Sequence, residues 1–324
     1  MVKQAVLVLG ANGFIGSAVV AGLAHSDEAV PILGVRPSAI PSHPTLERRN
    51  VDALQPQSVA AALEGVDCLV NCVAGDDRTL VGSAQAVFEA ARSARQPIRV
   101  IHLSTMSVYG SAIGLLDESA ALRGDLGAYS QAKVTAEALA ATYPSAVTLR
   151  PGCVFGPFSE QWTVRYARLL LAHRLGDLGP AGDGQCNLVA ISDVVQAVLC
   201  AIRNPDAEGR AFNLATPEVL SWNDFLIRFA IALRAVPVRR IGARRLSTES
   251  KLLAPPLKIL EILGGKLGMR RLPPPIPPSL MRLMAQDIRL DSRRAQEELG
   301  VRFKSVEQML SEAARWYLQS TSAA

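Results

Sequence analysis

Short apolar runs alternate with amphipathic segments over most of the chain. The apolar runs are rich in Val, Leu and Ile and have the length of buried strands, whereas apolar residues in the segments between them recur as they do on one face of a helix. The runs that we predict as strands are 5–10, 31–36, 68–74, 99–105 and 146–152. The segments that we predict as helices are 17–25, 58–65, 83–94 and 129–142.

The same alternation continues towards the C-terminus. We predict helices over 191–204, 221–233 and 305–319, and a strand over 211–216. The first of these helices should begin near Ser192 or Asp193, and the second should be capped by Ser221, with Asp224 three residues later. Strands separated by helices need crossover connections, which give a parallel sheet with both faces covered. The sequence therefore predicts an α/β fold with a doubly wound parallel sheet of the Rossmann type.

Length and composition fit such a fold. The chain has 324 residues, of which 49% are apolar and 19% charged. This is enough for a sizeable core, in one large α/β domain or in a main domain with a smaller one attached. Aromatic residues are few while Ala, Val and Leu are many, which favours helices packed on a sheet over a sandwich.

The segment 5–24 carries no charged residue and is long enough to cross a bilayer. However, it contains Gly10, Gly13, Gly16 and Gly22, which fit a strand, a turn and a helix better than a membrane span or a signal peptide. We therefore expect a cytoplasmic protein without a transmembrane or targeting segment. The five cysteines form no C-x-x-C pair and have no histidine at metal-ligand spacing, so we expect reduced thiols and no metal site.

A glycine-rich turn follows the first predicted strand and opens the first helix. Gly10, Gly13 and Gly16 are spaced three residues apart in "GANGFIG". Glycine allows a sharp turn and a close approach of the backbone to a diphosphate, and the helix N-terminus adds free N–H groups and a positive dipole end. Placed between a strand and a helix, this motif predicts a dinucleotide site.

The end of the second strand bears on the choice of cofactor. Where NAD-binding versions of this motif carry an acid for the ribose hydroxyls, this chain has Arg36. An arginine there can pair with the 2′-phosphate of NADP, so we expect NADP, with NAD as the alternative. Asp52 is a candidate for the adenine end, and Val73, Ala74 and Gly75 should pass close to the cofactor.

A tyrosine and a lysine stand four residues apart in a predicted helix. Residues at this spacing lie one above the other, so Tyr129 and Lys133 present a phenol and an ammonium side by side, which taken alone also fits an ordinary surface pair. Ser104 and Thr105 end the preceding strand, at the sheet edge where ligands collect. We expect the ammonium and a cationic nicotinamide to lower the pKa of Tyr129 and make it an acid or base near neutral pH.

These motifs resemble those of the extended short-chain dehydrogenase/reductase family, also called the NAD-dependent epimerase/dehydratase family. The matches are "GANGFIG", "STMSVYG", "YSQAK", "LRPGCVFGP" and "ISDVVQAV", which span residues 5 to about 220, and "DSRRAQEELG" near the C-terminus. The resemblance implies Tyr129 as proton donor or acceptor, Lys133 as ribose ligand, and Thr105 as hydrogen-bond partner of the substrate oxygen. The cofactor-binding residues that it implies are Gly10, Asn12, Gly13, Phe14, Ile15, Gly16, Arg36, Asp52, Val73, Ala74, Gly75, Ser104, Tyr129, Lys133, Pro151, Gly152 and Val154.

Family resemblance does not name the substrate. One hypothesis is an NADP(H)-dependent oxidoreductase acting on a ketone or secondary alcohol of a largely apolar small molecule, and the alternative is a nucleotide-sugar epimerase with a tightly bound NAD(P). Dehydratases of the family place Asp-Glu after the active threonine, where this chain has Met106 and Ser107. Sugar-nucleotide enzymes tend to carry an arginine where Cys186 and Asn187 stand, which favours the first hypothesis. A catalytically inactive NADP-binding protein is disfavoured by the intact triad.

The segment 234–294 differs in character from the rest of the chain. It holds fourteen Lys or Arg against four Asp or Glu, together with proline clusters that exclude a continuous helix. A basic surface of this kind is compatible with solvated charge, an anionic membrane, a carrier protein or a phosphorylated substrate. We find no nucleic-acid-binding motif, and the resemblance is compatible with a homodimer.

The sequence also predicts two domains. Residues 1–170 and about 186–220 should form the dinucleotide-binding domain, and about 171–185 with 221–324 a smaller α/β substrate-binding domain. An apolar face in the second part is predicted either as a cover for a greasy ligand or as ordinary core. Its residues are Leu252, Leu253, Leu257, Ile259, Leu260, Ile262 and Leu263.

Overall fold

A seven-stranded, all-parallel sheet forms the centre of the computed structural model, which describes residues 3–249 and 276–322. Its strand order is β10-β7-β5-β4-β1-β2-β3, so the chain winds outward in both directions from β1. The strands are β1 (Gln4–Leu9), β2 (Ala29–Val35), β3 (Arg48–Asn50), β4 (Cys68–Asn71), β5 (Arg99–Leu103), β7 (Ala146–Pro151) and β10 (Ala211–Leu214). This arrangement confirms the predicted doubly wound sheet.

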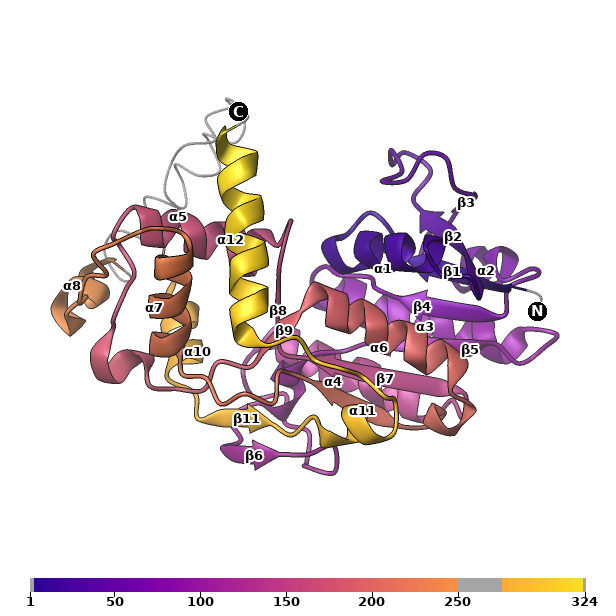
Figure 1. Cartoon of the computed structure of the whole chain (residues 1–324). Helices are drawn as coiled ribbons and strands as arrows, with labels where there is room; N and C mark the ends of the chain where they lie inside the picture. Colours follow the sequence, from indigo (N-terminus) through magenta and orange to yellow (C-terminus); the bar gives the residue numbers. More distant parts are fainter. Residues whose placement is uncertain (1–2, 250–275, 323–324) are drawn as a thin grey trace.

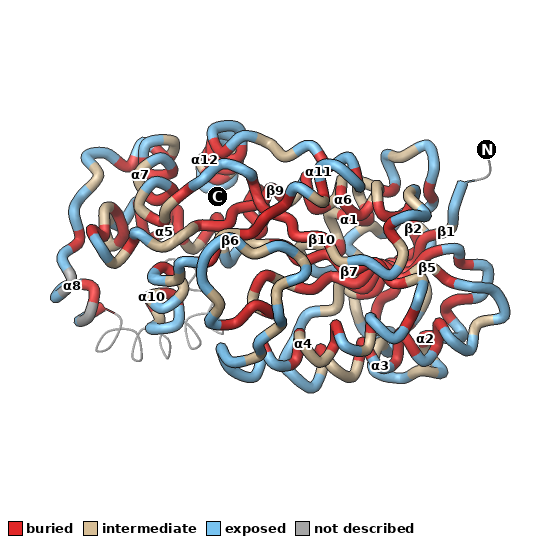
Figure 2. The backbone as a smooth tube through the Cα atoms, turned by 90° about the horizontal axis from the view of Figure 1, so that it is seen from below, coloured by how far each residue is buried: buried red, intermediate tan, exposed pale blue. Residues whose placement is uncertain are grey.

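Helices cover both faces of the sheet (Figure 2). One face is packed by α1 (Phe14–Ala24), α6 (Ile191–Arg203) and α11 (Arg293–Glu297), and the other by α2 (Pro56–Ala62), α3 (Asp77–Ser93) and α4 (Ala128–Ala141). The inner strands are buried almost throughout, which explains why they read as continuous apolar runs. With the faces covered, the carboxyl edge of the sheet is left as the place for a ligand.

A second core lies beside that edge (Figure 1). Aromatic rings fill it, with Phe155 edge-on to Phe225 and Phe229, and Tyr166 stacked on Trp222. Its helices are α5 (Arg165–Leu171), α7 (Trp222–Ala232), α8 (Ala243–Thr248), α10 (Pro278–Met284) and α12 (Val306–Ser322). Two small parallel sheets pair β8 (Cys153–Phe155) with β9 (Leu188–Ala190), and β6 (Gly114–Leu116) with β11 (Ile288–Leu290).

The predicted helix ends can be compared with the observed ones. Helix α7 begins where predicted, because Ser221 and Asp224 form a reciprocal capping box. Helix α6 begins at Ile191, slightly earlier than predicted, and has no side-chain cap at its first turn. Asp193 instead accepts the backbone N–H of Lys304 at 3.0 Å, so a residue expected to start the helix ties it to the segment before α12.

The short elements were not predicted. Strands β3, β6, β8, β9 and β11 have three residues each, too few for periodicity to identify them. Helix α5 packs in the second core, and helix α11 packs against the seven-stranded sheet. The division of the chain into two domains, like the homodimer, stays a prediction.

Two further expectations concern membranes and the basic segment. Among the described residues, no helix is long and apolar enough to span a bilayer. The apolar face predicted between Leu252 and Leu263 lies outside the described residues.

Candidate active site

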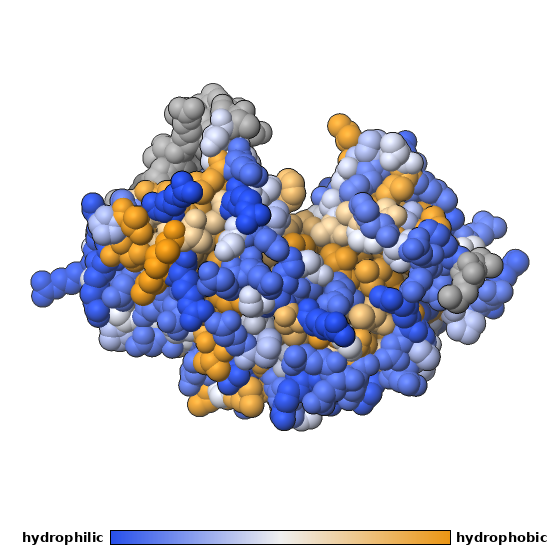
Figure 3. All heavy atoms as spheres, in the orientation of Figure 1, coloured by the Kyte–Doolittle hydropathy of each residue, from blue (hydrophilic) through white to orange (hydrophobic). Residues whose placement is uncertain are grey.

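A cavity of about 750 Å³ opens between the carboxyl edge of the sheet and the second core. The space-filling view shows a hollow between these two parts, with apolar atoms on its floor (Figure 3). Of the predicted site residues, those that line the cavity are Gly13, Phe14, Ile15, Ala74, Gly75, Ser104, Thr105, Tyr129, Pro151, Gly152 and Val154. Those that do not line it are Gly10, Asn12, Gly16, Arg36, Asp52, Val73 and Lys133.

The glycine turn is built for close backbone contact. Gly10 has a left-handed φ of 73°, and a Cβ there would lie 2.6 Å from the carbonyl oxygen of Cys72. A Cβ on Gly16 would lie 2.1 Å from the carbonyl oxygen of Gly10. Helix α1 begins at Phe14 without a side-chain cap, so its first N–H groups are free for an anion. These are the features that a dinucleotide diphosphate requires.

Other predicted cofactor residues surround this turn without lining the cavity. Asn12 donates to the carbonyl oxygen of Ile40 at 2.7 Å and accepts from the Ser42 amide, so it fixes the loop after β2 against the turn. Arg36 is exposed directly after β2. Asp52 caps the turn after β3 by accepting the Leu54 amide at 3.0 Å. A contact between Asp52 and an adenine stays a prediction.

Thr105 and Tyr129 meet in the cavity wall. Thr105 follows β5 and Tyr129 lies in the first turn of α4, and both line the cavity. Tyr129 is half-exposed, yet burial of its phenol raises its pKa, and the nearby Thr105 hydroxyl opposes this only in part. The prediction that Lys133 lowers this pKa is therefore wrong for the protein's own groups. In this arrangement the Tyr129 phenol is neutral near pH 7.

Lys133 lies behind the cavity wall. It is 6% exposed, and its Nζ donates to the carbonyl oxygen of Leu103 at 2.8 Å. Burial lowers its pKa to about 8, while Cys72 and Glu137 act to raise it. The neighbouring His102 is buried too, and burial together with Lys133 lowers its pKa to about 3. His102 is therefore neutral at physiological pH, and Lys133 carries the positive charge beneath the site.

A buried ion pair holds these elements together. Glu137, one helical turn after Lys133, accepts two hydrogen bonds from Arg150 at 2.7 and 3.1 Å and another from Ser104. Arg150 also donates to the hydroxyl of Tyr109 at 2.9 Å. Glu137 and Arg150 are nearly inaccessible to water. The pair thus joins β5, α4 and β7 at the places where each supplies a residue to the cavity.

Several lining residues were not predicted from the sequence. They come from the loop after β8, from α5 and from α10, and are Phe158, Ser159, Glu160, Gln161, Trp162, Arg165, Pro277, Ser279, Leu280 and Leu283. No motif marks them, because they reach the cavity only through the packing of the second core. Cys72, Met106, Ser107 and Cys153 line it as neighbours of predicted residues.

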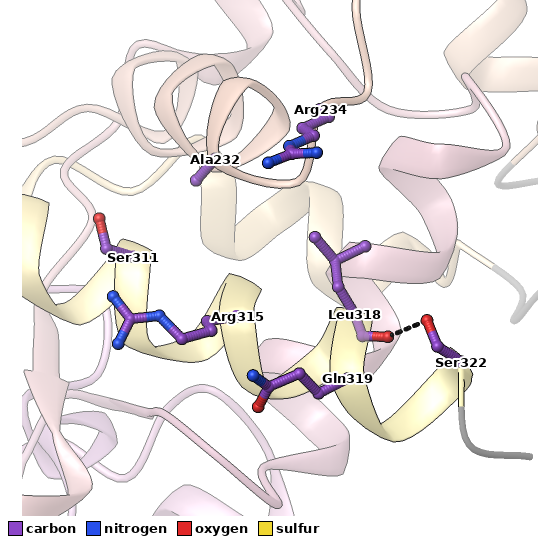
Figure 4. Close-up of a pocket in the computed structure, with 7 residues that line it drawn as sticks. All are labelled: Ala232, Arg234, Ser311, Arg315, Leu318, Gln319 and Ser322. Atoms are coloured by element: carbon purple, nitrogen blue, oxygen red, sulfur yellow. Dashed lines mark hydrogen bonds between the residues drawn. The ribbon is translucent and has the colours of Figure 1, made fainter.

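A second cavity of about 660 Å³ lies between the end of α7 and α12, apart from this site (Figure 4). It is lined by Ala232, Arg234, Ser311, Arg315, Leu318, Gln319 and Ser322. No acid, histidine, tyrosine or cysteine is among these lining residues. Acid–base chemistry therefore points to the first cavity.

The sequence profile of the NAD dependent epimerase/dehydratase family matches residues 6–215. The chain belongs to this family. The match runs from the first strand to the last strand of the sheet and includes the glycine turn and Thr105, Tyr129 and Lys133. Membership confirms the resemblance seen in the sequence, so the protein is an enzyme of this family. No curated protein sequence matches the chain.

Solved structures with the same fold cover nearly the whole chain. UDP-glucose 4-epimerase from Thermotoga maritima is 17% identical, with a TM-score of 0.73 over 98% of this chain and 100% of its own. UDP-glucuronic acid 4-epimerase from Bacillus cereus, in complex with UDP-glucuronic acid and NAD, is 18% identical, with a TM-score of 0.71 and the same coverage. dTDP-glucose 4,6-dehydratase from Bacillus anthracis, in complex with NAD, is 17% identical, with a TM-score of 0.72 over 99% and 98%. At these identities the likeness shows the fold.

The buried charge of Lys133 generates a prediction about stability. Its pKa falls from the usual 10.5 to about 8 on folding, so the unfolded chain binds more protons between these values and stability rises with pH across that range. We expect Lys133→Met to be more stable than the wild type near pH 7, by about 1–3 kcal/mol. The advantage should shrink as the pH rises from about 8 towards 10.5.

Urea unfolding of both proteins at about pH 7 and about pH 9.5 measures this difference. If the difference in free energy of unfolding between the two proteins stays constant or grows from pH 7 to pH 9.5, Lys133 is not buried as a cation.

Proposed function

We propose that the enzyme epimerises a hydroxyl-bearing carbon of a nucleotide sugar, with a nicotinamide dinucleotide held at the glycine turn. The observation that carries this proposal is Arg165, a cation in the wall of the cavity that also holds Tyr129 and Thr105. Among the described residues, Arg165 has no ion-pair partner, although Glu160 lines the same cavity. An unpaired guanidinium suits the diphosphate of a nucleotide sugar.

The position of Arg165 also bears on the arginine that the sequence lacks at Cys186 and Asn187. Cys186 and Asn187 stand where an arginine was expected, but both are buried. Asn187 donates to the carbonyl oxygen of Ile288 at 2.7 Å and accepts the Leu290 amide at 2.8 Å, so it anchors β11. A cation at this position would disrupt that anchor. Arg165 on α5 offers the same charge from another element, which supports a diphosphate-containing substrate.

Epimerisation is favoured over dehydration by the residues after Thr105. Met106 and Ser107 line the cavity there, and neither can act as an acid or base like the Asp-Glu pair of dehydratases. The two residues that follow Thr105 thus supply no acid to expel water. Thr105 and Tyr129 suit the oxidation and reduction of one hydroxyl.

The glycine turn fits the cofactor, because only hydrogen at Gly10 and Gly16 leaves room for the observed backbone approach. A nicotinamide dinucleotide supplies a hydride acceptor and donor when bound. Thr105 orients the substrate oxygen, and Tyr129 removes its proton and later returns it. Lys133, whose Nζ donates to the Leu103 carbonyl oxygen behind the cavity wall, would hold the ribose of the cofactor, and the cationic nicotinamide would favour the Tyr129 phenolate.

Arg36 supports NADP as this cofactor. It is exposed at the carboxyl end of β2, beside the loop that Asn12 holds over the glycine turn, and no acid occupies that strand end. Two of the structural neighbours named above, the UDP-glucuronic acid 4-epimerase and the dTDP-glucose 4,6-dehydratase, were solved with NAD, so NAD stays the alternative.

A second candidate is the reduction of a ketone on an apolar molecule. It is favoured by the apolar part of the cavity wall, where Met106, Val154, Trp162, Leu280 and Leu283 gather. Arg165 and the family membership weigh against it, because an apolar ketone would offer no partner to the half-buried Arg165 guanidinium.

The two candidates differ in their use of cofactor. An epimerase should interconvert a UDP- or GDP-hexose with no net change in nicotinamide absorbance, because the cofactor is regenerated in each turnover. Mass-balanced chromatography of the sugars, with absorbance recorded in parallel, measures both. Stoichiometric loss of NADPH with hydrophobic ketones, and no turnover of any nucleotide sugar, would refute the epimerase. Arg165→Met should raise KM for the nucleotide sugar about tenfold or more.

Tyr129 should be required for turnover. We expect Tyr129→Phe to lower kcat by about a hundredfold or more, because proton transfer is lost while the ring remains. Cofactor affinity, measured by fluorescence titration, should stay nearly unchanged. Tyr317→Phe, on α12 and outside the cavity lining, is the matched control. Near-normal kcat in Tyr129→Phe would remove this residue from the catalytic assignment.

Arg36 should set the cofactor preference. A charge-assisted contact to the 2′-phosphate is worth about 1.5–3 kcal/mol, so NADPH should bind roughly tenfold or more tighter than NADH. Arg36→Ala should remove most of this preference, and Arg302→Ala, also exposed, should retain it. Titration of both cofactors into the three proteins decides the matter. Equal wild-type affinities would contradict an NADP-specific role.

A further inference from the structure

One large aromatic side chain is exposed at the active-site cavity. Phe158 lines the cavity and yet is 71% exposed, more than most large apolar residues of the described chain. Phe side chains are usually buried, because burial of the ring from water is favourable. Packing against the rest of the protein therefore does not explain why this ring is exposed at the cavity.

The backbone holds this ring outward under strain. Phe158 has a φ of 66°, in the left-handed region that disfavours residues with a Cβ. The loop around it is fixed by two buried hydroxyls. Thr163 donates to the carbonyl oxygen of Gly156 at 2.7 Å and accepts its amide at 3.1 Å, and Ser159 donates to the Val154 carbonyl oxygen at 3.1 Å. The exposed position of Phe158 is thus built into the loop, and strain of this kind gathers at functional sites.

A second ring supports Phe158 from the C-terminal helix. Trp316 on α12 contacts it with ring centroids 4.9 Å apart and planes inclined by 54°. In the cartoon, the loop after β8 rises into the space between α12 and α1, which is the helix that begins at the glycine turn (Figure 1). Because Trp316 covers part of the Phe158 ring and the residue is still mostly exposed, a face of the ring is left for a ligand.

We infer that Phe158, backed by Trp316, is a stacking subsite for the planar heteroaromatic ring of a nucleotide bound in the cavity. The inference rests on the proposed function in so far as that function supplies nucleotides as ligands. Two rings have the required chemistry, the base of a nucleotide-sugar substrate and the nicotinamide of the cofactor. An aromatic side chain stacks on many kinds of planar ring, so the base and the nicotinamide have to be distinguished by measuring the binding of each ligand separately.

Isothermal titration calorimetry with UDP and with NADH, on wild type and Phe158→Leu, tests the subsite. Leucine keeps apolar bulk but has no π-face, so the ligand whose ring stacks should bind about tenfold more weakly. Phe158→Tyr should restore binding to within about threefold, because it keeps the ring. Ile113→Ala, at a residue 76% exposed and outside the cavity lining, is the control.

The outcomes separate the ligands and the two proposals. Weaker UDP binding assigns the subsite to the substrate base, and weaker NADH binding assigns it to the nicotinamide. Unchanged dissociation constants for both ligands in Phe158→Leu overturn the subsite while the proposed function stands. Weaker NADH binding in a protein that does not bind UDP supports the subsite and counts against a nucleotide-sugar substrate. If neither ligand binds the wild type, both proposals fail.

Discussion

The buried ion pair between Glu137 and Arg150 is the interaction on which the site depends. Removing two charges from water is costly, so such a pair persists only where every polar atom finds a partner. Ser104 and Tyr109 complete the pair's hydrogen bonds, and Asn213 accepts from the Tyr109 hydroxyl at 2.7 Å. Ser104 is next to Thr105 in the sequence, and Arg150 is next to Pro151, and both Thr105 and Pro151 line the cavity. The positions of the cavity residues are therefore set by a network that, apart from Ser104, lies outside the cavity lining.

The same region concentrates charge where water is excluded. Lys133 is buried at a cost that its carboxylate neighbour Glu137 offsets in part, and its pKa falls accordingly to about 8. His102 beside it stays neutral. Burial of this cation opposes folding near pH 7, so Lys133 is kept at a cost in stability, as is common at functional sites.

The two sides of the cavity have different origins. The sheet edge supplies the glycine turn, Thr105 and Tyr129, which suit any hydroxyl or ketone. The second core supplies Phe158, an exposed ring, and Arg165, which has no ion-pair partner among the described residues. Under the proposed function, the sheet edge carries the proton transfer and the second core binds the nucleotide diphosphate.

The sequence by itself determined the parallel sheet, the glycine turn, the capping of α7 and the placement of Tyr129 and Lys133 one turn apart on one helix, because periodicity, caps and helical spacing act over a few residues. Tertiary structure decided the rest. Phe158 and Arg165 reach the cavity only because the second core folds against the sheet edge. The pKa of Tyr129 rises because burial of its phenol outweighs the opposing contribution of Thr105, while the Lys133 ammonium lies behind the cavity wall, bonded to the Leu103 carbonyl oxygen. Burial and contacts between distant segments arise from the whole fold, so local sequence patterns cannot specify them.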